Sequence, residues 1–172
     1  MKFSASLFLG VAALCAVLAM STPPANAQKV LAENGDWTAY TMSENGRKVC
    51  YMFSRPKKEE GNYRRRGEAY AMVTRRQGSP TVEDVSVTSG YPYKDGTAAK
   101  LNIDGKVYNF GTLQDEYAWS DDPARDPLIV KGMIKGLKLT VRGTSRKDTY
   151  SLDTYSLKGF TATHKAIVKA CP

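Results

Sequence analysis

The sequence predicts an all-β sandwich with a short helix before a late strand and a second helix at the C-terminus. Short segments rich in β-branched and aromatic residues alternate with Gly, Pro, Asn and Asp. The segment LKLTVR at 137–142 alternates apolar and polar residues, as a strand with one buried and one solvated face does. Asp104-Gly105 lies between two such segments and is typical of a tight type I′ hairpin turn.

Eight segments are predicted to be strands, and their spacing suits a sandwich or a barrel. In chain order they are 36–42, 47–54, 68–76, 82–89, 99–103, 106–110, 137–143 and 149–157. The run VCYMF at 49–53 is apolar at consecutive positions. This pattern predicts a central strand that is covered on both faces, with the C-terminal segment as one cover.

Two segments carry helical signals. In DPLIVKGMIKG at 126–136, Asp126 is expected to cap the helix, Pro127 to occupy its first position, and Gly136 to end it in the left-handed conformation. Its apolar face comprises Ile129, Val130, Met133 and Ile134. The second helix is expected from about Phe160 to Ala170. Its inward stripe comprises Phe160, His164, Ile167 and Cys171.

The N-terminal segment 1–27 has the features of a secretory signal peptide. Lys2 precedes an apolar run from Leu7 to Met20, and an Ala-Asn-Ala site precedes Gln28, where cleavage is expected. The run is shorter than a membrane-spanning helix, and no other stretch in the chain is as long. We therefore expect a mature single domain at 28–172 without a transmembrane segment, located in the periplasm or at the outer surface.

The cysteine count predicts one disulfide. Cys15 is lost with the signal peptide, which leaves Cys50 and Cys171 as a pair in an oxidising compartment. A reactive thiol or a zinc ligand is the alternative, but one His and no further Cys do not build a common zinc site. We expect no metal and no cofactor.

The single histidine, His164, has a structural and a catalytic interpretation. A position on or beside the buried helix face predicts a neutral side chain that packs and forms a local hydrogen bond. A catalytic triad would need a nucleophile, and no serine lies in a G-x-S-x-G elbow. We expect no catalytic residues on this evidence.

The order of several short motifs resembles the invasion-associated locus B family of exported bacterial proteins. The matching pieces are W37-T-A-Y40, G46-R-K-V-C-Y-M-F-S-R-P56, G90-Y-P92, I103-D-G105, A118-W119, 129–143, D153-T-Y-S-L-K-G-F160 and A170-C171. The resemblance implies an immunoglobulin-like β-sandwich, export in a Gram-negative bacterium and a link to host-cell entry. It implies no catalytic residues. The segment 57–67 is longer and more charged than this resemblance leads us to expect, and His164 stands where a small residue would be more usual.

The basic balance of the chain suggests an anionic partner. The sequence has 25 Lys and Arg against 17 Asp and Glu, and loss of Lys2 would leave a net charge of +7. Such a charge favours encounters with lipopolysaccharide, anionic lipid or host glycans. The densest candidate polyanion site comprises Lys57, Lys58, Arg64, Arg65 and Arg66. The alternative is a solvated, mobile loop whose Glu59 and Glu60 partly cancel its charge. Nucleic acid is not expected, since no stacking platform is evident in the sequence.

Acidic residues surround Trp119. They are Asp115, Glu116, Asp121, Asp122 and Asp126. Such oxygens can hold calcium, and paired carboxylates can act as acid and base. In the structural alternative Trp119 anchors the loop to the sandwich, while Asp121 or Asp126 caps the following helix.

Two classes of function follow. The first is a non-enzymatic exported envelope or cell-surface protein that binds a protein or an anionic surface component. The second is a small periplasmic hydrolase or carbohydrate-acting enzyme that uses the carboxylates near Trp119. A concave pocket with two close carboxylates of raised pKa would favour the enzyme, and a shallow surface would favour the binding protein.

Overall fold

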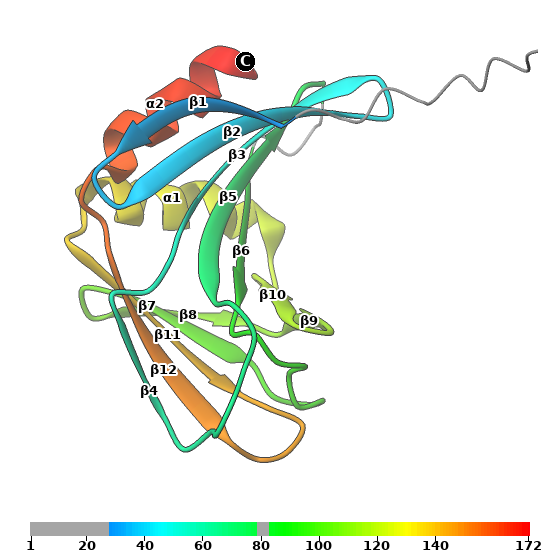
Figure 1. Cartoon of the computed structure of the whole chain (residues 1–172), viewed down its shortest axis with the longest axis vertical. Coiled ribbons are helices and arrows are strands. Elements are labelled where there is room, and N and C mark those ends of the chain that lie inside the picture. The colour runs from blue at the N-terminus through cyan, green and yellow to red at the C-terminus, as the bar shows by residue number, and fades with distance from the viewer. Residues whose placement is uncertain (1–27, 79–82) are drawn as a thin grey trace, which may run out of the picture.

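The computed structural model describes residues 28–78 and 83–172. The expected signal peptide at 1–27 lies outside the described residues. These described residues form two antiparallel sheets and two α-helices around one hydrophobic core (Figure 1). The predicted all-β sandwich is therefore confirmed. Within the described ranges, no helix is long and apolar enough to cross a membrane.

The larger sheet has seven strands in the order β1-β2-β3-β5-β6-β10-β9. Most of its neighbours in space are also neighbours in sequence, so hairpins build most of it. The strands are β1 (Lys29–Asn34), β2 (Trp37–Glu44), β3 (Arg47–Ser54), β5 (Tyr70–Arg76), β6 (Asp84–Thr88), β9 (Thr112–Gln114) and β10 (Tyr117–Trp119).

The smaller sheet has five strands in the order β4-β12-β11-β7-β8. They are β4 (Lys58–Gly61), β7 (Ala99–Ile103), β8 (Lys106–Phe110), β11 (Lys138–Thr144) and β12 (Tyr150–Ser156). The predicted hairpin between β7 and β8 is present, and Asp104 and Gly105 both have positive φ angles. Asp104 also accepts hydrogen bonds from the backbone of Leu137 and Lys138, which fixes the hairpin to the start of β11.

Each of the eight predicted strands is present, with ends shifted by at most a few residues; position 82, where the strand 82–89 is predicted to begin, lies outside the described residues. Four strands were not expected from the sequence: β1, β4, β9 and β10. They are short or lie at sheet edges, and β4, with the sequence KEEG, has no apolar side chain. Pairing with β12 makes β4 a strand, so part of the segment interpreted as a mobile loop is ordered structure.

Both helices are present, but the first is capped differently from the prediction. A 3-10 turn, η1 (Pro123–Arg125), precedes α1 (Asp126–Lys135), and Asp122 caps η1 by accepting from the Ala124 backbone. Asp126 is the first helical residue rather than a cap. Gly136 has φ −82° and is extended rather than left-handed.

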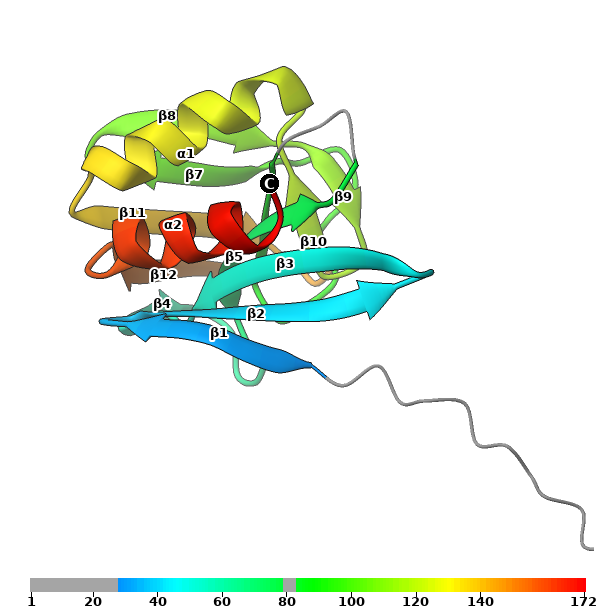
Figure 2. The ribbon, with the colours of Figure 1, turned by 90° about the horizontal axis from the view of Figure 1, so that it is seen from above.

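The C-terminal helix α2 (Phe160–Ala170) lies against β1, β2 and β3 on the core side of the larger sheet, as the two views show (Figure 2). Phe160 packs edge-on against Trp37 of β2, with ring centroids 4.8 Å apart. Phe160 and Ile167 are fully buried, as the predicted stripe requires. This stripe orients the end of α2 toward β3.

The predicted disulfide is present. Cys50 in β3 is bonded to Cys171 just after α2, with their Cα atoms 6.0 Å apart. The prediction that β3 is covered on both faces is wrong. Cys50 and Met52 face α2 and the core, but Tyr51 and Phe53 point to the opposite face and stay partly exposed.

Candidate functional site

The basic segment 57–66 does not form one exposed cluster of cations. Lys57 pairs with Asp36 at 2.5 Å, and Lys58 pairs with Glu60 at 2.8 Å. Arg64 and Arg65 are exposed. Of the five predicted polyanion-binding residues, these two therefore present their charge to solvent with no ion pair recorded among the described residues.

Arg66 has a structural role that excludes it from the predicted polyanion site. Its side chain is only 3% exposed and forms a bidentate ion pair with Asp153 of β12. Glu59 lies 2.8 Å from the same guanidinium, and the ring of Tyr63 covers it. Although burial lowers the pKa of Arg66, its bonds to Asp153 and Glu59 outweigh burial and raise the pKa above its ordinary value. The residue stays charged and joins two strands of the smaller sheet.

The five acidic residues around Trp119 in the sequence do not gather into a calcium site. Asp121 accepts from the backbone of Gly111 at 2.7 Å, and Asp122 caps η1 at 3.0 Å. Asp126 accepts from the backbone of Val85 at 3.1 Å and so joins α1 to β6. Within the described residues no group of three or more potential ligands could hold a metal ion.

The outer face of the seven-stranded sheet carries a continuous row of aromatic side chains. This aromatic row comprises Tyr40, Tyr51, Phe53, Tyr70, Tyr117 and Trp119. Successive ring centroids are 5.5 to 6.4 Å apart, and the rings come from β2, β3, β5 and β10. All six are partly exposed, because α2 covers the opposite face of the sheet.

Strand register explains why these rings meet. Tyr40 stands directly opposite Tyr51 in the β2–β3 pair, while Tyr70 and Tyr117 both stand opposite Thr88 of β6. Thr88 is small, so the Tyr70 and Tyr117 hydroxyls meet across it at 2.8 Å. Side chains alternate between the faces of a strand, which places the row opposite the side that bears the disulfide.

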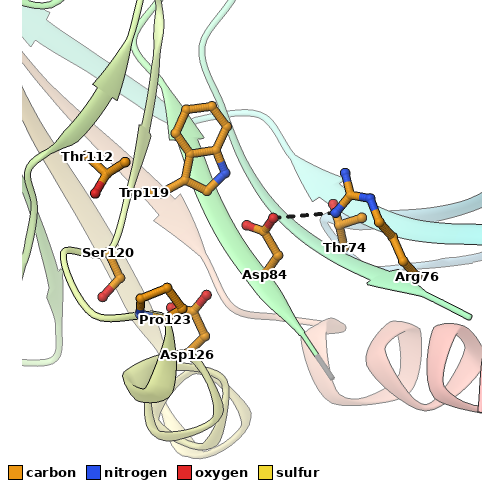
Figure 3. A pocket seen from close by; sticks show the side chains of 8 residues that line it. All are labelled: Thr74, Arg76, Asp84, Thr112, Trp119, Ser120, Pro123 and Asp126. Carbon is orange, nitrogen blue, oxygen red and sulfur yellow. Dashed lines mark hydrogen bonds and ion pairs between the residues drawn. The ribbon is translucent and has the colours of Figure 1, made fainter. Parts of the chain in front are cut away.

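A hollow of about 320 Å³ lies at the β10 end of the row (Figure 3). It is lined by Thr74, Arg76, Asp84, Thr112, Trp119, Ser120, Pro123 and Asp126. Figure 3 shows the indole of Trp119 and the carboxylates of Asp84 and Asp126 around the same space. The hollow continues the surface of the row, because Trp119 belongs to both.

The two carboxylates of the hollow are held in an unfavourable environment. Burial raises the pKa of Asp126 to about 6, and the nearby Asp84, Asp122 and Glu83 act in the same direction. Burial also raises the pKa of Asp84, although Arg76 and a hydrogen bond with the Trp119 side chain oppose this. One oxygen of each carboxylate, Oδ1, is shielded from water and accepts no hydrogen bond. A buried carboxylate oxygen without a donor destabilises the ionised form of the group.

His164 belongs to a hydrogen-bonded network on the other face of the sheet, away from the hollow. Its Nε2 lies 2.5 Å from Glu83, which also accepts from Arg75 at 3.1 Å, and Arg75 donates to the backbone oxygen of Cys171 at 2.9 Å. Burial raises the pKa of Glu83, but the contacts with His164 and Arg75 lower it by more, so the pKa falls below its usual value. The hydrogen-bond partner of His164 is therefore distant in the sequence, whereas the prediction was a local one.

The aromatic row and Asp84 were not singled out from the sequence. Each strand contributes only one or two of the rings, so no local window shows the cluster. The run VCYMF is apolar on both faces and therefore predicts burial of Tyr51 and Phe53, which the structure does not show. The signal that could have found the row is an aromatic residue at alternate positions of several neighbouring strands, on the face opposite Cys50.

The fold and family follow from comparison with known proteins. The family model described as "Invasion associated locus B (IalB) protein" matches residues 37–168. A crystal structure of invasion associated protein B from Bartonella henselae is similar in fold, with a TM-score of 0.57 and 17% sequence identity. The alignment covers 81% of this chain and 95% of that one. Among curated proteins, no sequence matches the chain. Since the family model spans most of the two-sheet domain, the chain belongs to the invasion associated locus B family.

Proposed function

We propose that the chain is an exported, non-enzymatic envelope or cell-surface protein that binds a protein partner with the aromatic row. The observation that carries this proposal is six aromatic side chains in continuous contact on the sheet face opposite α2, which neither helix of the described residues covers. Aromatic side chains supply large contact area and are enriched at the centres of interfaces. Contiguous exposed apolar surface of this kind commonly marks an interaction site.

Export is supported by two further features. The Cys50–Cys171 disulfide persists in an oxidising compartment and is rare in the cytosol. The segment 1–27 has the sequence of a signal peptide. By its family, we extend the proposal to adhesion or entry at the host-cell surface, with the protein in the periplasm or at the outer surface.

A bacterial strain that lacks this chain provides the test. It would be complemented with the wild type, with a row variant (Tyr51→Thr, Tyr70→Thr) and with a control variant (Val107→Thr, Leu152→Thr) on the outer face of the other sheet. Threonine keeps strand propensity, so both variants should fold and be exported.

We expect cell fractionation to find all three proteins outside the cytosol, and the row variant alone to lose most host-cell association. Retention in the cytosol, or host-cell association unaffected by the row variant, would contradict the proposal. Immunoblots of each fraction distinguish a loss of binding from a loss of protein.

An enzymatic function is the second candidate, because the hollow contains a carboxyl group with a pKa of about 6. A group with such a pKa suits general acid catalysis near neutral pH. Asp126 would be the acid and Asp84 its partner. Hydrolysis of aryl glycosides or aryl esters that is lost in both Asp126→Asn and Asp84→Asn would establish this function and overturn the non-enzymatic one.

A further inference from the structure

We propose that the hollow between Trp119, Asp84 and Asp126 binds a cationic side chain, arginine or lysine, of the protein partner. This inference rests on the proposed function, since it assigns the ligand at one end of the aromatic row. The hollow supplies an aromatic face, two carboxylates and three hydroxyl groups.

On each carboxylate of the hollow, one oxygen lacks a donor, while the other accepts from the Val85 backbone (Asp126) or from Arg76 (Asp84). Asp126 is only 3% exposed, and its Oδ1 accepts no hydrogen bond, nor does Oδ1 of Asp84. Buried acceptors in proteins are nearly always paired, so two unpaired ones on residues that line the same hollow point to a ligand. Neither oxygen touches solvent in the free protein, so binding involves rotation of the carboxylates toward the ligand.

The wall of the hollow is acidic in spite of the basic chain. The chain as a whole has a net charge of +8, yet Asp115 and Glu116 line the adjoining surface beside Trp119. Among the described residues Arg76 is the one cation in the lining, and it is already shared between Glu44 and Asp84 at 3.5 Å each. The remaining charge is negative and complements an ammonium or guanidinium group.

Trp119 adds an attraction that a neutral ligand would lack. A cation over an indole face is attracted by the ring quadrupole, and tryptophan is the most effective aromatic side chain in this respect. A guanidinium group also presents several donors in one plane, which suits two carboxylates that face one space. The aromatic row beyond Tyr117 would then contact the apolar part of the same partner.

The experiment titrates the purified protein with the capped tripeptides Gly-Arg-Gly, Gly-Lys-Gly and Gly-citrulline-Gly at low salt and pH 7.5. Citrulline matches arginine in shape without its charge. The chain has two tryptophans, and Trp37 is only 1% exposed, so fluorescence changes report Trp119. Trp119→Phe removes this signal and identifies its source. Cellobiose tests a saccharide in place of a cation.

We expect the two cationic peptides to bind at least tenfold more tightly than the citrulline peptide, with cellobiose inactive. Asp126→Asn and Asp84→Asn should each weaken binding about tenfold. Asp95→Asn, which removes a 90% exposed carboxylate elsewhere, should leave binding unchanged. Circular dichroism checks that all variants fold. Binding should also weaken below about pH 6, because Asp126 then takes up a proton and loses its charge. The charged groups around Asp126 are Asp84, Asp122, Glu83 and Arg76.

Equal binding of the citrulline peptide, binding of cellobiose instead of the cations, or no effect of both asparagine variants would overturn the inference. If host-cell association still depends on Tyr51 and Tyr70, only the inference about the hollow fails. If it does not, the proposed function fails as well. The two failures are therefore distinguishable.

Discussion

The guanidinium of Arg66 and the carboxylate of Asp153 form a bidentate ion pair in the interior, although 87 residues separate them in the chain. Arg66 also donates to the backbone oxygen of Ser89 at 3.2 Å, and Asp153 accepts from Ser151 at 3.4 Å. The pair thereby connects the segment before β5 with β12 of the other sheet. A charge that sequence reasoning assigned to an external ligand is neutralised inside the protein.

Replacement of Arg66 should destabilise the fold. Arg66→Met leaves Asp153 buried without its cation, so we expect a loss of about 3 to 5 kcal/mol in the free energy of unfolding. Urea denaturation measures it. The double variant Arg66→Met Asp153→Leu should recover most of the loss, because two apolar side chains need no partner. Wild-type stability in the single variant would contradict the structural role of the pair.

The polyanion hypothesis now rests on Arg64 and Arg65, whose side chains are exposed. If they attract an anionic surface, Arg64→Gln Arg65→Gln should weaken binding to heparin or anionic vesicles at low salt, by about 1 kcal/mol per residue. The matched control is Lys165→Gln Lys169→Gln on the exposed side of α2. Equal losses in both pairs would assign the effect to net charge. Binding unchanged in both would leave no role for these cations.

Loss of the disulfide should release α2 from the larger sheet. Cys171→Ser is expected to lower the free energy of unfolding by about 2 to 5 kcal/mol, since the bond closes a very long loop. Intact-mass analysis of native protein should show two hydrogens fewer than the reduced form. Two alkylatable thiols in protein taken from the periplasm would contradict the bond.

Asp126 should make stability depend on pH in the direction opposite to that of most carboxylates. Its pKa is 3.8 in the unfolded chain and about 6 in the fold, so the folded state binds the proton more strongly. The resulting stabilisation is full below about pH 3.8 and is lost as the pH rises through 6. It amounts to no more than about 3 kcal/mol.

Asp126→Asn keeps an acceptor for the Val85 backbone and removes the charge. The variant should therefore be more stable than the wild type at pH 7.5 and closer to it at pH 4.5. Thermal unfolding at both pH values measures the difference. An Asn variant that is less stable at pH 7.5 would show that the ionised carboxylate has a favourable partner in the free protein.

The sequence predicts the strands that carry a local pattern better than the short strands at the sheet edges. Strands such as 99–103 and 106–110 carry a local pattern and a turn dipeptide, and they are present as expected. Edge strand β4 has no such pattern, because its pairing with β12 depends on residues about 90 positions away. The disulfide required only a count of cysteines.

The candidate site was predicted only in part for the same physical reason. Asp126 and Trp119 were singled out because acidic residues cluster around Trp119 in the sequence. The other residues of the hollow include Asp84 of β6 and Thr74 of β5, which stand opposite each other in the β5–β6 pair. Only the pairing of these strands places them beside Trp119, and no local sequence pattern shows it. Likewise, the sequence does not distinguish Arg66 from the exposed Arg64 and Arg65, because its partner Asp153 is distant in the chain.

The bond between Cys50 and Cys171 encloses all strands from β4 onward, along with both helices. A protease that cuts once anywhere inside this loop therefore produces two pieces that remain covalently linked. The exposed Arg64 and Arg65 are the kind of residues that trypsin-like proteases cleave, and the strands on either side of them belong to different sheets. A nicked molecule would migrate as one band without reductant and as two with it, so intact size alone would not reveal that the chain had been cut.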